Sequence, residues 1–188
     1  MRLGVECVPV RRKEDFQGLS GLIIPGGEST CLGHLIKNFG LDQEIRDAYA
    51  NGVKLWGTCA GAILLATEVT NDSPHLGVMD ITITRNAFGS QLSSFHEVIE
   101  IPKVAEETIP LTFNRAPKIA RTGASVTVLG RLGDCIVAAE TEQLLVTVFH
   151  PELTPSLAFH RYFAQKCGVA TWADGESSLI DPEWSPYS

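Results

Sequence analysis

Cys59 has the sequence surroundings of a nucleophile held on a sharp turn. The apolar run at residues 53–56 leads into Gly-Thr-Cys-Ala-Gly at residues 57–61, and an Ala/Ile/Leu-rich segment follows. Glycines two before and two after one residue allow a strand-to-helix turn that lifts its side chain into the open, as in a nucleophile elbow. The start of the following helix also favours the thiolate, the reactive form of a cysteine. A buried structural cysteine beside a tight turn is the alternative that this motif alone leaves open.

His150 and Glu152 could supply the base and the carboxylate that a cysteine nucleophile needs. A histidine takes up and returns the proton, and a carboxylate orients its imidazole. The two residues end the apolar run 144–149, and in extended backbone residues i and i+2 face the same side. A lone histidine is usually a satisfied core residue, but the neighbouring carboxylate and the cysteine of the elbow together favour a Cys-His-Glu triad.

Strand and helix signals alternate through the first third of the chain, which favours a parallel sheet covered on both faces. Ser29 or Thr30 is the predicted cap of the first helix. Two adjacent glycines in the turn before it let amide N–H groups point at a ligand. The predicted elements are strands at 4–10 and 21–24, a glycine-rich turn at 25–30, helices at 29–38 and 41–50, and a helix after Cys59 that fades around 71–74.

From residue 81 the pattern changes to short strands separated by turn residues, and a last helix closes the compact part of the chain. We therefore predict one domain over residues 1–167, followed by an acidic, flexible tail over residues 168–188. Trp172 and Trp184 are the only argument that this tail docks on a surface. The predicted strands are 81–84, 95–101, 111–114, 126–129, 136–139 and 144–149, and the helix is 155–167.

Composition narrows the classes of function. A net charge of −7 argues against nucleic acid or an anionic membrane as the main partner. No apolar run approaches the roughly 20 residues that span a bilayer. Five scattered cysteines fit reduced thiols in the cytoplasm better than a disulfide framework. Cys31 and His34 share a predicted helical face, but no second pair completes a zinc site, so we predict no metal or cofactor and assign these two residues to packing.

Taken together, the motifs resemble a known family. Gly-Thr-Cys-Ala-Gly at 57–61 and Phe-His-Pro-Glu at 149–152 are similar to the class I glutamine amidotransferases, which have a flavodoxin-like, three-layer α/β fold. Pro-Gly-Gly-Glu-Ser-Thr at 25–30 and His-Pro-Glu-Leu-Thr at 150–154 look more narrowly like the glutaminase subunits of pyridoxal 5′-phosphate synthase. Supporting matches stand at 74–77, 85–91 and 115–117, and the resemblance covers about residues 3–167.

This resemblance implies hydrolysis of L-glutamine to glutamate and ammonia, with Cys59 as nucleophile, His150 as general base and acid, and Glu152 as its orienter. Backbone N–H groups of Gly27 and Ala60 would form the oxyanion hole. The positions that match the family's glutamine-binding residues are Gly27, Glu28, Ser29, Arg85, Asn114 and Arg115.

The resemblance also implies a partner. Glutaminases of this kind pass ammonia to a synthase subunit with a (β/α)₈ barrel, and they are weak until that subunit docks and orders the oxyanion hole. We therefore expect a hetero-oligomer in the cytoplasm, with no cofactor on the glutaminase.

Two features depart from the family pattern. Asn114 stands where the family usually has an aliphatic residue, a change that a backbone contact would survive. Family members also begin with a strand carrying a Leu-Gln-Gly turn and a helix, whereas this chain begins at the second strand. In flavodoxin-like order the first strand lies between the segments at 5–8 and 22–24, so both would lose a shared neighbour. This leaves two alternatives, a start codon placed too late or a truncated form with impaired folding and activity, and we favour the first.

Two other functions compete with this interpretation. One is a glutaminase of another pathway, such as the one feeding imidazole glycerol phosphate synthase, against which Gly-Gly-Glu-Ser-Thr argues. The other is a binding or regulatory subunit that has lost activity, against which the intact Cys59, His150 and Glu152 argue. Without the family, Arg85 and Arg115 would be assigned to surface salt bridges.

Overall fold

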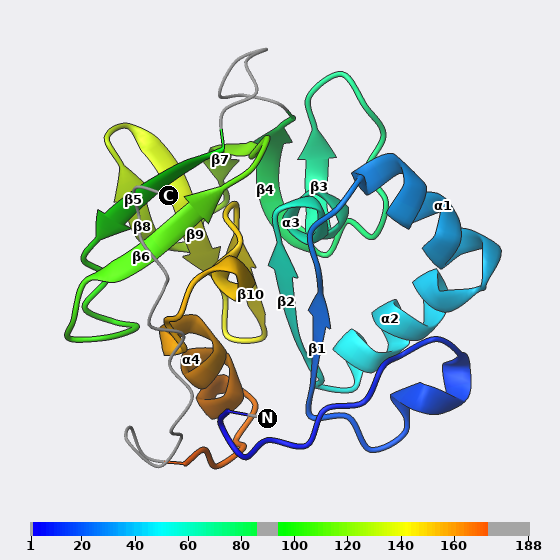
Figure 1. Ribbon diagram of the computed structural model, residues 1–188. Coiled ribbons are helices and arrows are strands. Elements are labelled where there is room, and N and C mark those ends of the chain that lie inside the picture. The colour runs from blue at the N-terminus through cyan, green and yellow to red at the C-terminus, as the bar shows by residue number, and fades with distance from the viewer. Residues whose placement is uncertain (1, 86–93, 173–188) are drawn as a thin grey trace.

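A curled sheet of eight strands crosses the computed structural model, which describes residues 2–85 and 94–172 (Figure 1). Its strands follow the order β1-β2-β10-β9-β7-β4-β3, and β8 pairs with β9. Two further strands, β5 and β6, pair antiparallel in a second sheet. The strands are β1 (Gly21–Ile24), β2 (Lys54–Thr58), β3 (Ala66–Val69), β4 (Met79–Thr84), β5 (Phe95–Ile99), β6 (Ile109–Phe113), β7 (Lys118–Thr122), β8 (Thr127–Leu132), β9 (Cys135–Glu140) and β10 (Leu144–Thr147).

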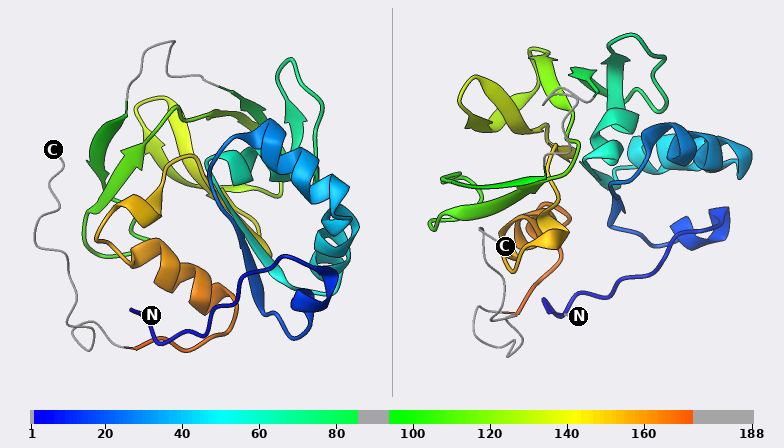
Figure 2. Two further views of the ribbon diagram at one scale, coloured as in Figure 1. Left: turned by 45° about the vertical axis from the view of Figure 1, so that its right-hand side comes forward. Right: turned by 45° about the horizontal axis from the view of Figure 1, so that its top comes forward.

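Helices lie on both sides of the parallel part of this sheet. Figures 1 and 2 show α1 and α2 on one side of β1 and β2, and α4 on the other. None of the helices among the described residues is long and apolar enough to cross a membrane. The helices are α1 (Ser29–Asn38), α2 (Leu41–Ala50), α3 (Ala60–Leu65) and α4 (Ala158–Lys166), with two 3₁₀ turns, η1 (Lys13–Phe16) and η2 (Pro151–Leu153).

The parallel strands β1, β2 and β10 form the centre of the core. Since helices cover both faces, β2 and β10 are buried along nearly their whole length rather than alternating between buried and exposed residues. Trp56 on β2 is fully buried, and its indole N–H donates to the Thr147 hydroxyl of β10 at 3.2 Å. Its ring packs against Phe159 and Phe163 of α4, with centroids 6.3 and 5.5 Å away. These contacts fix α4 against the two central strands.

The strand predicted at residues 4–10 is wrong. Residues 5–11 have irregular backbone, and among the described residues β1 pairs only with β2. The expected shared neighbour between this segment and β1 is not among the described strands, so the segment has no ladder in which its backbone groups could pair. Most of its residues are exposed.

Other predicted elements differ in detail. Helix α2 has the predicted bounds, and α1 ends at Asn38 as predicted, but Glu28 caps α1 instead of Ser29 or Thr30. The helix after Cys59 ends at Leu65 instead of fading around 71–74, because the chain enters β3 there. Strand β7 was not predicted, and α4 begins at residue 158 instead of 155.

The start of the predicted tail packs beside the N-terminal segment. The Trp172 N–H donates to the Leu3 carbonyl at 3.0 Å, and the Trp172 ring lies against Gly4. The rest of the tail, including Trp184, lies outside the described residues, as does most of the motif at 85–91.

Candidate active site

The turn between β2 and α3 has the geometry of a nucleophile elbow. Cys59 has φ 48° and ψ −104°, a conformation rarely adopted by residues with side chains. A Cβ on Gly57 would lie 2.5 Å from the Gly61 carbonyl carbon, and a Cβ on Gly61 would overlap the Ile24 carbonyl oxygen of β1. Both clashes are with backbone, which cannot turn aside. The two glycines are therefore needed for the chain to reverse this tightly around Cys59.

His150 reaches Cys59 because their strands are neighbours. Strands β2 and β10 are parallel, with Thr58 opposite Thr147, so both chains emerge at the same edge of the sheet. The Cys59 N–H donates to the Thr147 carbonyl at 2.8 Å, and the His150 N–H donates to the Thr112 carbonyl of β6 at 2.8 Å. These backbone bonds fix the starting points of both side chains.

Glu152 contacts His150, but by a different geometry from the predicted one. The chain is not extended here, because Pro151 begins the 3₁₀ turn η2 with His150 as its first flanking residue. The tightly wound turn brings the Glu152 Oε1 to 2.7 Å from the His150 Nδ1. The predicted pairing of the two side chains is therefore present, while the extended backbone expected to produce it is not.

The pKa values of both His150 and Glu152 are shifted toward the charged forms. Hydrogen bonding to the Cys59 sulfur, and then to Glu152, raises the pKa of His150 to about 10 in spite of its burial. Burial is the largest single influence on Glu152 and raises its pKa, but the hydrogen bond from His150, a backbone hydrogen bond and the nearby histidines together outweigh it and leave this pKa lowered. The His150 imidazolium is thus a positive charge hydrogen-bonded to the Cys59 sulfur.

One cavity of about 380 Å³ collects the predicted substrate residues. Cys59 and His150 lie in its wall, whereas Glu152 is not among its lining residues. Asn114 presents its backbone, since its carbonyl accepts from the Cys59 sulfur at 3.9 Å. The remaining predicted residues that line the cavity are Gly27, Glu28, Ser29, Ala60, Arg85 and Arg115.

Two residues of the site escaped the sequence analysis, and the contacts of a third, Gly26, were not predicted. Ile63 and Pro117 also line the cavity. Ile63 could have been found, because it lies four residues after Cys59 and thus on the same face of the helix. Gly26 packs against the triad, and a Cβ there would lie 3.0 Å from the His150 Nδ1 and 3.3 Å from the Cys59 Cβ. Only a residue without a side chain fits between the two.

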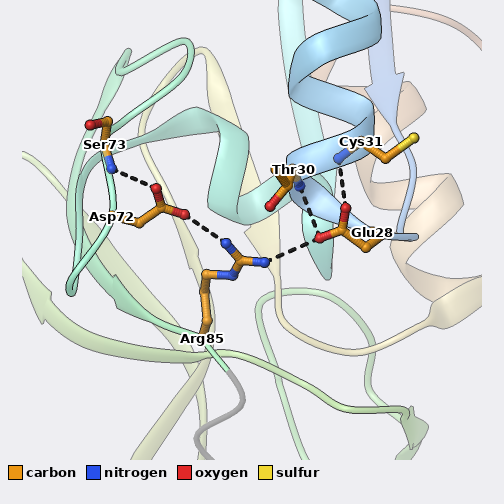
Figure 3. Close-up of polar contacts among 6 residues, drawn as sticks. All are labelled: Glu28, Thr30, Cys31, Asp72, Ser73 and Arg85. Atoms are coloured by element: carbon orange, nitrogen blue, oxygen red, sulfur yellow. Dashed lines mark hydrogen bonds and ion pairs between the residues drawn. The ribbon is translucent and has the colours of Figure 1, made fainter.

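Arg85 lines the cavity, at what we call its rim. Figure 3 shows the guanidinium of Arg85 between the carboxylates of Glu28 and Asp72. Its guanidinium donates to Glu28 Oε1 at 3.1 Å and to Asp72 Oδ2 at 2.6 Å. Glu28 also caps α1 by accepting from the N–H groups of Thr30 and Cys31, at 3.1 and 2.6 Å. The surface salt bridge that the residues alone suggested for Arg85 is thus present, and it lies at the cavity.

The predicted packing role of Cys31 and His34 is wrong, because both residues are exposed on α1. Among the residues that the structure describes, no group of three His, Cys, Asp or Glu side chains is placed to hold a metal ion. All five cysteines of the chain are free.

Comparison with known proteins places these features in a family. The model of the SNO glutamine amidotransferase family matches residues 1–169. The pyridoxal 5′-phosphate synthase subunit PdxT of Syntrophus aciditrophicus is 51% identical over 187 residues, covering 100% of this chain and 84% of that protein. The PdxT subunit of Haemophilus influenzae (strain PittEE) is 45% identical, covering 90% of each chain.

Solved structures agree with the fold predicted from the sequence. A glutamine amidotransferase crystal structure is 44% identical, with a TM-score of 0.83 over 88% of each chain. A crystal structure from Thermoplasma acidophilum, described as a GMP synthase component, is 16% identical and shows the fold alone. Its TM-score is 0.55 over 83% of this chain and 76% of its own. The predicted flavodoxin-like α/β fold of class I glutamine amidotransferases is confirmed.

Proposed function

Because the chain belongs to the SNO glutamine amidotransferase family, we propose that it is the glutaminase subunit of a pyridoxal 5′-phosphate synthase. It would hydrolyse L-glutamine through a triad of Cys59, His150 and Glu152. The observation that carries this proposal is their joint geometry: a strained cysteine in the cavity wall, and beside it a histidine whose far nitrogen lies 2.7 Å from a carboxylate. PdxT is the name carried by the relatives that share about half of this sequence.

In the first half of the reaction, the Cys59 thiolate attacks the side-chain amide carbon of glutamine. The electron pair of the C=O bond moves to oxygen, and a tetrahedral oxyanion forms. His150 then gives its proton to the departing nitrogen, the C–N bond breaks, and ammonia and a thioester remain. With its Nδ1 held by Glu152, the imidazole keeps its other nitrogen toward Cys59 throughout.

In the second half, water replaces ammonia. His150 takes a proton from the water, whose oxygen attacks the thioester carbon and forms a second oxyanion. Collapse of this intermediate breaks the C–S bond and releases glutamate and the Cys59 thiolate, with the proton back on His150. The same three side chains thus serve both halves, and no external proton carrier is required.

Backbone N–H groups of Ala60 and Gly27 are the proposed oxyanion donors. Ala60 is the first residue of α3, and amides of a first helical turn have no partner within their own helix. Gly27 has φ 142°, a conformation open to glycine, and it also lines the cavity. Both N–H groups would stabilise charge that develops only during the reaction, which is where such donors lower the barrier most.

Arg85 and Arg115 are the cations that line the cavity, and they suit the α-carboxylate of glutamine. Glu28, Ser29 and the carbonyl of Asn114 offer acceptors for its α-ammonium group. We propose that ammonia then passes to a (β/α)₈ synthase subunit in a hetero-oligomer. The free cysteines suit a reducing cytoplasm as the site of action.

Glutamate release from glutamine, measured with the synthase subunit of the same organism present, tests the proposal. Cys59→Ala should abolish the activity while the thermal melt stays close to that of the wild type, because the small side chain still fits the elbow. Activity within a few-fold of the wild type would refute the assignment of the nucleophile. Ammonia should pass to the pyridoxal 5′-phosphate synthase partner but not to imidazole glycerol phosphate synthase, which separates the two pathways.

A further inference from the structure

Asp72 accepts a hydrogen bond from Arg85, although Asp72 does not line the cavity. It lies in the turn after β3, where it forms an isolated β-bridge with Val69 and its Oδ1 accepts from the Ser73 N–H at 2.8 Å. Its other oxygen accepts from Arg85 at 2.6 Å, the shorter of the two bonds that the guanidinium makes to carboxylates. Figure 3 shows Arg85 between Asp72 and Glu28, which come from different segments of the chain. Asp72 itself is not among the residues lining the cavity.

We propose that Asp72 is a positioning residue for glutamine, which keeps the Arg85 guanidinium at the cavity rim in the orientation that binds the substrate α-carboxylate. This inference rests on the proposed glutaminase function. A guanidinium carries five N–H donors in one plane, and the two carboxylates use one on each terminal nitrogen. With the plane fixed at two points, its remaining donors can bind a carboxylate without first searching for an orientation.

Arg85 depends on the two carboxylates for its position, whereas Glu28 and Asp72 are each held by backbone hydrogen bonds. Glu28 is held by the first amides of α1 and Asp72 by the Ser73 amide, so neither needs Arg85 to stay in place. Arg85, by contrast, has a long side chain that loses rotamer freedom when it is ordered. The backbone hydrogen bond from Ser73, and then Arg85, lower the pKa of Asp72, so its charge persists at neutral pH. The two anchored carboxylates therefore order the arginine before substrate arrives.

A role in stability explains the arrangement less well. The side chains of Arg85 and Asp72 are 30% and 37% exposed, and ion pairs of this exposure contribute at most about 1 kcal/mol to folding. Preorganising a binding group instead lowers the entropic cost of binding the ligand. Substitution of Asp72 should therefore change glutamine affinity more clearly than it changes the melting temperature.

The test uses the full chain with the synthase subunit, and Cys59→Ala to prevent turnover. Calorimetric titration with glutamine should give a Kd that Asp72→Asn raises about two- to fivefold, the range that an ion pair of this kind supplies. Asp80→Asn is the matched control. Asp80 of β4 forms a more exposed aspartate–arginine pair with Arg121 of β7 at 2.8 Å, and neither residue lines the cavity. This control should leave the Kd unchanged.

Two further measurements show whether Asp72 acts through Arg85. In an Arg85→Ala background, Asp72→Asn should have no additional effect on the Kd. In the active enzyme, Asp72→Asn should raise KM by the same factor and leave kcat unchanged, whereas Asp72→Glu should recover part of the loss.

The outcomes separate this inference from the proposed function. If glutamine binds and is hydrolysed by the wild type, but Asp72→Asn leaves both Kd and KM at wild-type values, the positioning role alone is overturned. An equal effect of Asp72→Asn with and without Arg85 overturns it as well. If Cys59→Ala binds no glutamine, both the positioning role and the glutaminase assignment fail.

Discussion

Gly26→Ala would place a single methyl group between the side chains of Cys59 and His150, the proposed nucleophile and base. Gly26 does not require the left-handed backbone region, so alanine can adopt its conformation and the added Cβ is the only change. That Cβ would overlap the His150 Cε1 and lie 3.0 Å from its Nδ1. The imidazole has little freedom to move aside, because Nδ1 is bonded to Glu152 and the backbone N–H is bonded to Thr112.

These contacts indicate how far Gly26→Ala would lower the reaction rate and the folding stability. Ordinary carbon contacts lie at about 3.5–4.0 Å, and the overlap with the His150 Cε1 is the deepest one, so either the imidazole or the turn before α1 must shift by about 1–1.5 Å. Displacement of a catalytic group by about 1 Å can lower the rate about 100-fold, or about 2.7 kcal/mol in the activation barrier. Overpacking costs about 1–3 kcal/mol of folding stability. In a chain of this size, that lowers the melting temperature by a few degrees and leaves the protein folded at room temperature.

Glutamate release in the presence of the synthase subunit measures the loss of rate, and a thermal melt measures the loss of stability. Gly123→Ala is the matched control: the nearest atoms to its Cβ all belong to Asp80, and neither residue lines the cavity, so this crowding lies away from Cys59 and His150. The control should keep wild-type activity. If Gly26→Ala retained kcat/KM within about threefold of the wild type, a shift of about 1 kcal/mol or less, the crowding of His150 would not matter for catalysis.

Three further predictions concern the charged groups. Glu152→Gln should lower kcat tens- to thousandsfold in the same assay, less than His150→Asn, because it orients the imidazole without taking its proton; a harmless Glu152→Gln would mean that another carboxylate holds His150. The pKa of His150 is raised from 6.5 to about 10, so its charge stabilises the fold fully below about pH 6.5 and this contribution is lost as the pH rises toward 10. Thermal melts should therefore show the difference between wild type and Glu152→Gln shrinking over that interval, and a difference that grows would contradict the pairing. Glu140 is buried and accepts from Lys166 at 2.8 Å. Glu140→Gln should therefore lower the free energy of unfolding in urea by about 3 kcal/mol without changing glutaminase activity. A loss below about 1 kcal/mol would show that Lys166 finds another partner.

Local signals allowed the elbow to be predicted from the sequence. Gly57 is required by crowding within a few residues, because a Cβ there would meet the Gly61 carbonyl. Gly61 was found by its spacing from Cys59, although the atom that a Cβ there would meet, the Ile24 carbonyl oxygen, belongs to β1. The bounds of α2 were likewise set by the glycines at 40 and 52 that flank it. In such cases the residues that determine a structure are neighbours in the chain.

Features that depend on distant residues were not predicted. Asp72 reaches Arg85 across a turn and a strand, and its sequence neighbourhood resembles any polar loop. Gly26 was assigned to a ligand-binding turn, and its contact with His150 could not be inferred before the neighbouring strands β2 and β10 were known. Residues 4–10 show the opposite error. Their composition suits a strand, but a strand also needs a partner, which composition does not report.

The adjacency of β2 and β10 has a consequence for how related chains can vary in length. In the sequence, β3 to β9 lie between β2 and β10, the two paired strands that precede Cys59 and His150. We call this part of the chain the excursion. Lengthening a loop within the excursion leaves the separation of Cys59 and His150 unchanged. A slip of one residue between β2 and β10 would instead move His150 by about 3.3 Å and reverse the faces of the strand. An alignment of active relatives should therefore show insertions and deletions gathered between β3 and β9, and none in the turns that follow β2 and β10.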